Sequence, residues 1–558
     1  MPETKSKFLI PAIGAAVIVT GSIAAYMYLK GPSGNSSDAL ASAKIVPSTA
    51  FIATYVSTDP QAWAKLQQFG TPEAQKIVAK NLDSLNKDLL TESNISYEKD
   101  LKPWVGGVMI AVLPSTPANP TPNSGTATRE ANILMVVGIK DKLAALNFAK
   151  KLKQEKGVTT KEIDYKGEKI SETTGKGKPS YSAVLNNTYV VLASERQVVE
   201  NSIDTLKGQP SFASKEGANN VFAKTVDVKN AVAQIYVPNY KDMVQQLMAT
   251  NPQAIALPLQ IMRQFKQVNS MVAGVGIDDG GVRMKAIALL DSKDNKFSSE
   301  NTATKVVANF PGDTLALING NGISRWWTSV TTAVEQSQDY PELKQVIAQA
   351  RGQLKAVNFD LDKDIFGWMD GEFGFAAIPS NQGILAPLGV GGGFVFDTSD
   401  RKTAESTFAK LDNFAKTQKI NVVQRNINGK DVTEWQIPQQ GALLAHGWLN
   451  QNSVFIGFDG SVASAIASAK SQSLDNSDNF KAVTNSIEKP NGGFHLDMYL
   501  DINKIVPLVN RLGVQGQVPP RTSAILDSIR GLGVTATTLD KSTSQIEMLL
   551  ALKPKTAK

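Results

Sequence analysis

The sequence predicts an α+β protein: an N-terminal transmembrane helix followed by two tandem copies of one module, each an antiparallel sheet with packed helices. Three observations support this fold class. The chain has an uncharged run near its N-terminus, an internal repeat over most of its remaining length, and neighbouring strand-like segments joined by short turns. Because strands joined by short turns run antiparallel, each copy is expected to form an antiparallel sheet with helices on one face.

The uncharged run extends from Phe8 to Leu29 and contains 22 residues. A helix of that length is about 33 Å long, enough for a hydrocarbon core of roughly 30 Å. Lys5 and Lys7 precede the run, which favours a cytoplasmic N-terminus and places the rest of the chain outside the cytoplasm. The run is longer than the apolar part of a cleaved signal peptide, although cleavage after Ala43 remains the alternative.

The internal repeat is marked by residues that recur 264 positions apart. The matched pairs are Asp100 with Asp364, Trp104 with Trp368, and Gly107 with Gly371. Further along, Phe148-Ala149-Lys150 matches Phe408-Ala409-Lys410 at a slightly smaller offset. A fixed order of such matches predicts a duplicated structural module.

The repeat and the apolar run together define the expected organisation of the chain. In chain order we expect a cytoplasmic tail and transmembrane anchor at 1–30, a flexible tether at 31–43, a first α+β repeat at 44–292, a linker at 293–306, a second α+β repeat at 307–553, and a tail at 554–558. Within the first repeat we expect strands at 50–56, 105–113, 133–139 and 231–237, a helix at 142–156, and a final hairpin within 272–290.

Composition excludes several kinds of chemistry. The chain of 558 residues has no cysteine, which rules out disulfides, thiolate metal sites and thiol nucleophiles. The formal charge is +7, but the lysines are scattered and no run of five basic residues appears. We therefore expect a mildly basic, solvated surface and no nucleic-acid partner.

Several motifs resemble a known family. They are a Pro-initiated strand at Pro47, a first helix containing Trp63, the segment Phe69-Gly70-Thr71-Pro72, and Asp100-Leu101-Lys102-Pro103-Trp104 before an apolar strand. The chain resembles a cyanobacterial family of membrane-anchored proteins catalogued as a domain of unknown function. The second repeat departs from the pattern, with Gly367 where the first has Pro103. The resemblance implies a periplasmic or thylakoid-lumenal location for the C-terminal part, and it supplies no functional residues.

Candidate catalytic and metal-binding residues are few. The histidines are His446 and His495, and His495 shares a strand face with Asp497, as a general base and its orienting acid would. No Gly-x-Ser-x-Gly elbow accompanies them, so structural histidines are the favoured interpretation. The segment 360–364 begins like a calcium loop but has Ile365 and Gly371 where glycine and glutamate are required. We predict no catalytic residue, metal or cofactor.

The residues Asp370-Gly371-Glu372 and the glycines at 389–393 also carry no expected chemistry. The acidic pair is typical of a turn. The glycine run precedes a strand, whereas the glycines of a phosphate-binding loop follow a strand and open a helix. Asp100 and Asp364 are expected to accept backbone N–H bonds in the turn that places Trp104 or Trp368.

One loop differs between the repeats in a way that suggests a contact site. In the second repeat it carries Ile384, Leu385 and Leu388, whereas the matching loop at 115–128 is polar. Large aliphatic side chains are costly to leave in water. We predict that this loop contacts a protein partner or the membrane; packing between the two modules is the alternative. The segment 254–259 is a second apolar outlier.

These observations predict a non-enzymatic, membrane-tethered, extracytoplasmic binding or scaffold protein with a protein partner in the membrane or envelope. Two alternatives remain open. One is a carrier or sensor of a hydrophobic ligand, which a large apolar cavity would favour. The other is an unrecognised hydrolase, which perturbed carboxylates converging on His495 would favour.

Overall fold

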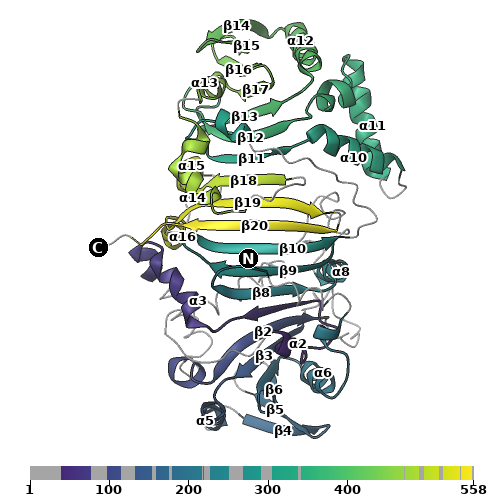
Figure 1. Ribbon diagram of the computed structural model, residues 1–558, viewed down its shortest axis with the longest axis vertical. Coiled ribbons are helices and arrows are strands. Elements are labelled where there is room, and N and C mark those ends of the chain that lie inside the picture. Colours follow the sequence, from purple (N-terminus) through teal and green to yellow (C-terminus); the bar gives the residue numbers. More distant parts are fainter. Residues whose placement is uncertain are drawn as a thin grey trace, which may run out of the picture. The chain divides into compact units, whose positions relative to one another are not determined.

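The computed structural model describes residues 39–76, 97–114, 132–153, 159–174, 179–215, 218, 226–250, 268–290, 305–336, 341–469, 472–488, 495–513, 520–540 and 542–555 (Figure 1). The predicted span at 8–29, the polar loop at 115–128, the apolar segment at 254–259 and most of the linker at 293–306 lie outside these residues.

The chain divides into two compact units. Unit 1 comprises Met1–Asn295 with Ser542–Ser544 and Pro554–Lys558, and unit 2 comprises Lys296–Lys541 with Gln545–Lys553. The C-terminal segment contributes to unit 1, where Pro554 forms a β-bridge with Phe69. The predicted repeat boundaries, 44–292 and 307–553, stay a prediction.

The strands of unit 1 pair in the order β4-β5-β6-β7-β3-β2-β1-β8-β9-β10, all antiparallel. Their bounds are β1 Ile52–Val56, β2 Val105–Leu113, β3 Asn132–Ile139, β4 Thr159–Tyr165, β5 Glu168–Thr174, β6 Ser180–Leu185, β7 Tyr189–Ala193, β8 Ala231–Val237, β9 Val268–Ile277 and β10 Gly281–Leu290.

The described helices of unit 1 are α2 Ala39–Ala43, α3 Pro60–Ala64, α5 Lys142–Lys153, α6 Arg196–Leu206 and α8 Tyr240–Thr250. Short 3₁₀ segments lie at Lys65–Gln68 (η1) and Phe212–Ser214 (η3), and a π-helical turn lies at Tyr97–Leu101 (η2). Residues of α2 and α6 pack into one core cluster of the sheet, and Tyr240 and Met243 of α8 pack into another. Both clusters include strand residues, so helices cover the sheet from two sides.

The strands of unit 2 pair in the order β14-β15-β16-β17-β13-β12-β11-β18-β19-β20, which is the order of unit 1 with each label raised by ten. Their bounds are β11 Ala316–Asn321, β12 Glu372–Pro379, β13 Val390–Asp397, β14 Asn421–Ile427, β15 Lys430–Ile437, β16 Gly441–Trp448, β17 Ser453–Phe458, β18 His495–Asp501, β19 Ile529–Asp540 and β20 Thr543–Leu552.

The described helices of unit 2 are α10 Ile323–Gln336, α11 Pro341–Ala356, α12 Arg401–Thr417, α13 Gly460–Ala467, α14 Asp478–Thr484, α15 Ile502–Leu512 and α16 Pro520–Leu526. Shorter segments are η4 Val306–Asn309, η5 Leu361–Gly367 and η7 Leu474–Asn476. Aspartates start several of these helices: the Asp400, Asp459 and Asp501 side chains accept N–H bonds from the first turns of α12, α13 and α15.

The predicted fold class is wrong in its arrangement of sheets. The twenty described strands belong to one antiparallel sheet, whereas a separate sheet was expected for each repeat. Alternation along a strand specifies which face is buried, but it does not specify which neighbour pairs at an open edge, where unpaired backbone groups invite a further strand. None of the described helices is long and apolar enough to cross a membrane, and the predicted span at 8–29 lies outside the described residues.

The repeat markers Asp364 and Trp368 organise one end of unit 2. The Trp368 indole N–H donates to the carbonyl oxygen of Asp364 (2.8 Å), and its ring packs against Phe396 and Phe408. The Asp364 carboxylate accepts from the backbone N–H of Asp360 (2.8 Å), as expected for a turn, and from Lys410 Nζ (2.7 Å). Together these contacts join η5, α12 and the sheet.

Unit 1 has the same arrangement. The Trp104 indole N–H donates to the carbonyl oxygen of Asp100 (2.7 Å), and the ring stacks on Phe148 with centroids 5.5 Å apart. The ion pair uses Lys151, one position beyond the lysine that the sequence matching selects. Gly107 leaves room for the Tyr55 ring, and Gly371 lets the backbone approach the carbonyl oxygen of Asp397, so a side chain at either position would clash.

Replacing Trp368 by alanine should therefore lower the free energy of unfolding of unit 2 by about 3–5 kcal/mol, because the ring is buried and its loss leaves a cavity. Chemical denaturation followed by circular dichroism measures this change. Trp326→Ala is the matched control, since that ring is exposed. Equal stability losses in the two variants would show that Trp368 has no special role in the core.

Candidate functional site

The loop between β12 and β13 contains the three predicted contact residues. Leu388 is 51% exposed, whereas Ile384 and Leu385 are half-buried. The backbone N–H of Leu385 donates to Asp459 Oδ2 (2.9 Å), and the same carboxylate caps α13 through Ser461. The loop is thus tied to the start of α13.

A second contact fixes the other end of the loop. Gly389 has a φ of +68°, and the guanidinium of Arg511 and the side chain of Leu508, both on α15, lie where a side chain at 389 would be. The loop therefore packs on α13 and α15 of its own unit. Of the three predicted residues, only Leu388 is left largely exposed.

A larger apolar surface lies on the sheet of unit 2. In the register of five neighbouring strands, Met498 lies beside Ile318, Ile318 beside Phe375, Phe375 beside Phe394, and Phe394 beside Ile456. Directly opposed residues in antiparallel strands point to the same side of a sheet. We call this row, together with Phe458, the aromatic face.

The rings of the aromatic face contact one another. Phe375 and Phe394 have centroids 5.1 Å apart in an edge-to-face arrangement, and Phe394 and Phe458 are 5.5 Å apart. Towards α12, the cluster continues into the buried rings of Phe373 and Phe396, beneath Trp368 and Phe408. Contacts of this kind favour a continuous, ordered apolar layer.

The end of this layer away from α12 is open. Ile318 is 41% exposed and Phe458 is 40% exposed, which is unusual for large apolar side chains in the middle strands of a sheet. The position that matches Ile318 in unit 1 is Thr54, which lies on β1 and is 1% exposed. The same place in the fold is therefore covered in unit 1 and uncovered in unit 2.

The helix that follows the matching strand explains the difference. In unit 1, α8 follows β8 and contributes Tyr240 and Met243 to a core cluster with Ile52 and Ile235, the strand partners of the covered face. In unit 2, α15 follows β18, and none of its residues is buried. The helix that buries Tyr240 and Met243 in unit 1 thus has a counterpart in unit 2 that lies against β18 and β19 without burying any of its own residues.

Two buried carboxylates lie where β12 begins and β13 ends. The Glu372 carboxylate accepts from the backbone N–H groups of Lys305 (2.7 Å) and Val306 (2.8 Å), and burial raises its pKa. Burial also raises the pKa of Asp397, which accepts from Ser453 Oγ (2.5 Å). Glu372 was expected to belong to an ordinary turn; its burial depends on the start of η4, which lies far from it in sequence.

His446 is a structural residue in this arrangement. Its ring stacks on Phe408 (centroids 4.6 Å apart), and Nε2 lies 2.9 Å from Asp412 Oδ1, which also accepts from Trp435 Nε1 (2.7 Å). Burial acts to raise the pKa of Asp412, but the hydrogen bonds from His446 and Trp435 outweigh it and hold the pKa below its usual value. His495 lies on β18, and the Asp497 carboxylate accepts from Thr535 and Asn319.

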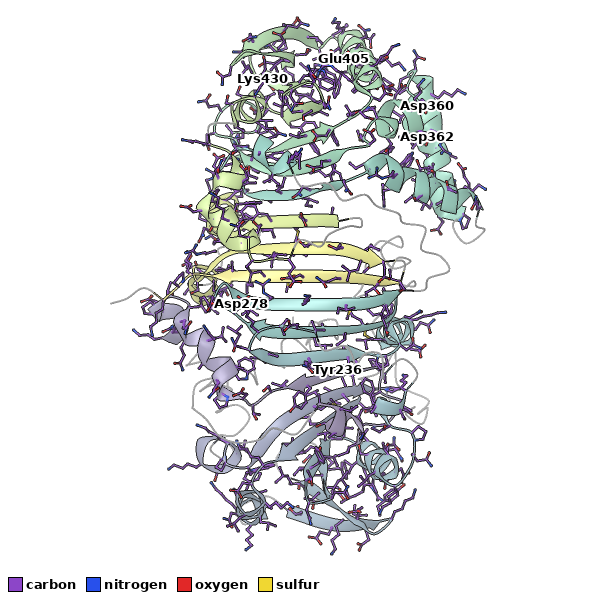
Figure 2. The ribbon with its side chains drawn as sticks, in the orientation of Figure 1. Tyr236, Asp278, Asp360, Asp362, Glu405 and Lys430 are labelled. Carbon is purple, nitrogen blue, oxygen red and sulfur yellow. The ribbon has the colours of Figure 1, made fainter. Side chains whose placement is uncertain are left out.

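The three aspartates of the calcium-like segment point to different donors. Asp360 and Asp362 lie close to the helices α10 and α11 (Figure 2). Asp360 caps η5 through the N–H groups of Asp362 and Lys363, and Asp362 forms a two-point ion pair with Arg351 (2.8 and 3.0 Å). Asp364 binds Lys410. Burial acts to raise the pKa of Asp364, but the hydrogen bonds from Lys410 and the Asp360 backbone, together with nearby lysine charge, outweigh burial and hold the pKa below its usual value. N–H donors therefore occupy carboxylates that a cation would need.

These features define a class of protein: an antiparallel-sheet protein with peripheral helices, in which buried polar groups serve packing and one apolar sheet face is open. The chain belongs to the family described as "Protein of unknown function (DUF3352)", whose model matches residues 12–552. No curated protein matches the chain.

Among solved structures, the chain is similar to two crystal forms of TP0453. Form III shares 9% identity with a TM-score of 0.26, covering 48% of this chain and 83% of that one. Form I shares 8% identity with a TM-score of 0.25, covering 45% and 78%. Scores this low carry no argument about fold or function.

The buried carboxylates give a pH prediction. A carboxyl group whose pKa is raised by folding binds protons more tightly in the folded state, so its effect on stability becomes less favourable as pH rises through the raised pKa. Asp397→Asn removes this ionisation and keeps an acceptor for Ser453. The variant should have a higher melting temperature than the parent at pH 7, and the difference should vanish below the ordinary aspartate pKa of 3.8.

Melting temperatures between pH 3 and pH 8 test this prediction, with the exposed residue in Asp313→Asn as the control. An Asp397→Asn protein that melts below the parent at pH 7 would mean that the ionised carboxylate stabilises unit 2.

Proposed function

We propose that this protein is a non-enzymatic, membrane-tethered, extracytoplasmic binding protein, and that the aromatic face of unit 2 is its binding surface for an apolar segment of a partner protein. The observation that supports the proposal most is the contrast between the units: α8 closes over the matching face in unit 1, and α15 leaves Ile318 and Phe458 exposed in unit 2.

The energetics favour an occupied surface. Each large apolar side chain gains roughly 1.5–3 kcal/mol when it leaves water, and the exposed parts of the aromatic face lie next to one another along the sheet. A duplicated fold that buries this region in one unit has no structural need to expose it in the other.

The tether is supported by the sequence. The uncharged run at 8–29 has the length of a membrane span, and the lysines before it favour an outward-facing C-terminal part. The family resemblance supports a periplasmic or thylakoid-lumenal location. A partner in the same membrane or envelope would be held at high local concentration by such a tether.

The absence of enzymatic activity is part of the proposal. His446 and the aspartates at 360–364 are each bound to a structural partner. The carboxyl groups with a raised pKa are Glu372 and Asp397, which accept hydrogen bonds from backbone or serine donors. None of these contacts forms a nucleophile–base pair.

Carrying a hydrophobic small molecule is a second candidate function. It is favoured by the aromatic layer, which continues from exposed Phe458 into the buried rings beneath α12. A ligand that enters at the open end would contact the same residues that a partner protein would contact, so the two functions are separated by what is found bound.

Photocrosslinking in native membranes tests the proposal. A benzophenone amino acid replaces Ile318 in the full chain, and illumination should give a discrete adduct of higher mass that contains a second protein. Adding Phe458→Ser should reduce the yield severalfold while the chain stays folded, which a thermal melting curve of the variant checks. The same label at Ser406, an exposed residue of α12, is the control and should give no adduct.

Each other outcome has a defined meaning. An adduct that adds only the mass of a lipid or other small molecule would replace the scaffold proposal by the carrier. Equal adduct yields from positions 318 and 406, or none from either, would contradict the assignment of the aromatic face as a binding surface.

A further inference from the structure

Helix α5 of unit 1 is anchored on one side only. Its inner side carries Phe148, which stacks on Trp104, and Lys151, whose Nζ lies 2.6 Å from Asp100 Oδ2. These contacts fix the helix on η2 and set its orientation about its own axis. The residues on the opposite side are therefore held outward.

Two leucines lie on the outward side. Leu143 is 68% exposed and Leu146 is 59% exposed, and both are among the three most exposed large apolar side chains in the described part of the chain. Residues three apart on a helix are neighbours, so the two leucines form one small apolar patch. Nothing in the packing of the described residues of unit 1 requires this patch.

Lysines flank the patch on the same side of the helix. Lys142 lies four positions before Leu146 and Lys150 four positions after it, and both are exposed. The helix contains no acidic residue. The nearby Asp141 caps the helix through the N–H of Ala144 (3.0 Å), and Asp100 is held by Lys151.

The surroundings of α5 are also positively charged. Lys140 precedes the helix and is half-buried; burial, and then the charge of Lys102, lower the pKa of its ammonium group. An anion placed here would meet several lysines and few free carboxylates. The combination of a basic surface and outward leucines is typical of helices that lie on anionic membrane surfaces.

The matching helix of unit 2 serves as an internal comparison. With Phe148 matched to Phe408, the positions of Leu143 and Leu146 correspond to Thr403 and Ser406 of α12. Helix α12 also carries the acids Glu405 and Asp412. The same helix position thus tolerates polar and acidic residues, and the leucine–lysine pattern of α5 is not a requirement of the fold.

We infer that α5 is a second membrane contact, which inserts Leu143 and Leu146 at the headgroup level of an anionic bilayer while its lysines bind lipid phosphates. The contact is separate from the aromatic face, so either surface can fail without the other. Opposite charge selects the lipid: a bilayer with anionic headgroups provides both the phosphates and the apolar layer that this side of the helix matches.

The test uses the full chain reconstituted into lipid vesicles. Because the sequence contains no cysteine, Asn147→Cys introduces a unique site on α5 for an environment-sensitive fluorophore. With about one-third anionic lipid in both leaflets, the label should shift to the blue and be quenched by a lipid-attached quencher. Vesicles of zwitterionic lipid alone should give neither effect, and 1 M salt should weaken both because it screens the lysines.

Two variants complete the test. Leu143→Ser with Leu146→Ser should reduce the bound fraction of the helix roughly tenfold or more, without changing the melting temperature, because both side chains are exposed. A label at Ser406→Cys on α12 should remain in an aqueous environment in every lipid. Identical emission from α5 in anionic and zwitterionic vesicles, or an anionic-lipid response unaffected by the leucine changes, would overturn the inference. The inference would also be overturned if a soluble acidic protein quenched the fluorophore on α5 and the lipid-attached quencher did not.

Discussion

The register of β12 against β11 and β13 determines what unit 2 presents to its surroundings. Phe375 pairs with Ile318 on one side and with Phe394 on the other, which places large apolar residues in one row across the sheet. Shifting the register by one residue would put Gly374 or Ala376 in that row and send the phenylalanines to the opposite side. The aromatic face therefore depends on the pairing of the strand backbones. Trp368 packs on Phe373 and Phe396 of the paired strands, and its hydrogen bond to the Asp364 carbonyl oxygen fixes its position.

Duplication gives the structure an internal reference. The two units share a strand order, and the Asp–Trp–Lys arrangement recurs in both. Differences between matched positions can therefore be attributed to something other than folding. Two such differences stand out: Ile318 against Thr54 on the sheet, and Leu143 with Leu146 against Thr403 with Ser406 on the helix. Unit 2 exposes an isoleucine where unit 1 has a buried threonine. Unit 1 exposes two leucines where unit 2 has polar residues.

Much of the fold could be predicted from the sequence, because alternation and turn residues act locally. The strands at 105–113 and 231–237 and the hairpin ending at Leu290 lie where the pattern places them. The joining of strands into one sheet could not be predicted, since edge pairing leaves no periodic signal. Nor could the aromatic face: Ile318 and Phe375 lie far apart in sequence, and α15 has the same amphipathic pattern as a helix that closes over its sheet. Comparing the loops did identify Leu388, but Leu385 and Ile384 pack within the unit.

The proposed function requires that the aromatic face is covered when the protein is in the membrane to which we propose it is tethered. Cysteine reactivity measures this directly, because the chain contains no other thiol. The Ile318→Cys variant is treated with a small maleimide in intact membranes and again after purification. Ser406→Cys is the reference. The account predicts that position 318 reacts several times more slowly in the membrane than after purification, while position 406 reacts equally in both. Equal reactivity of position 318 in the two states would contradict it.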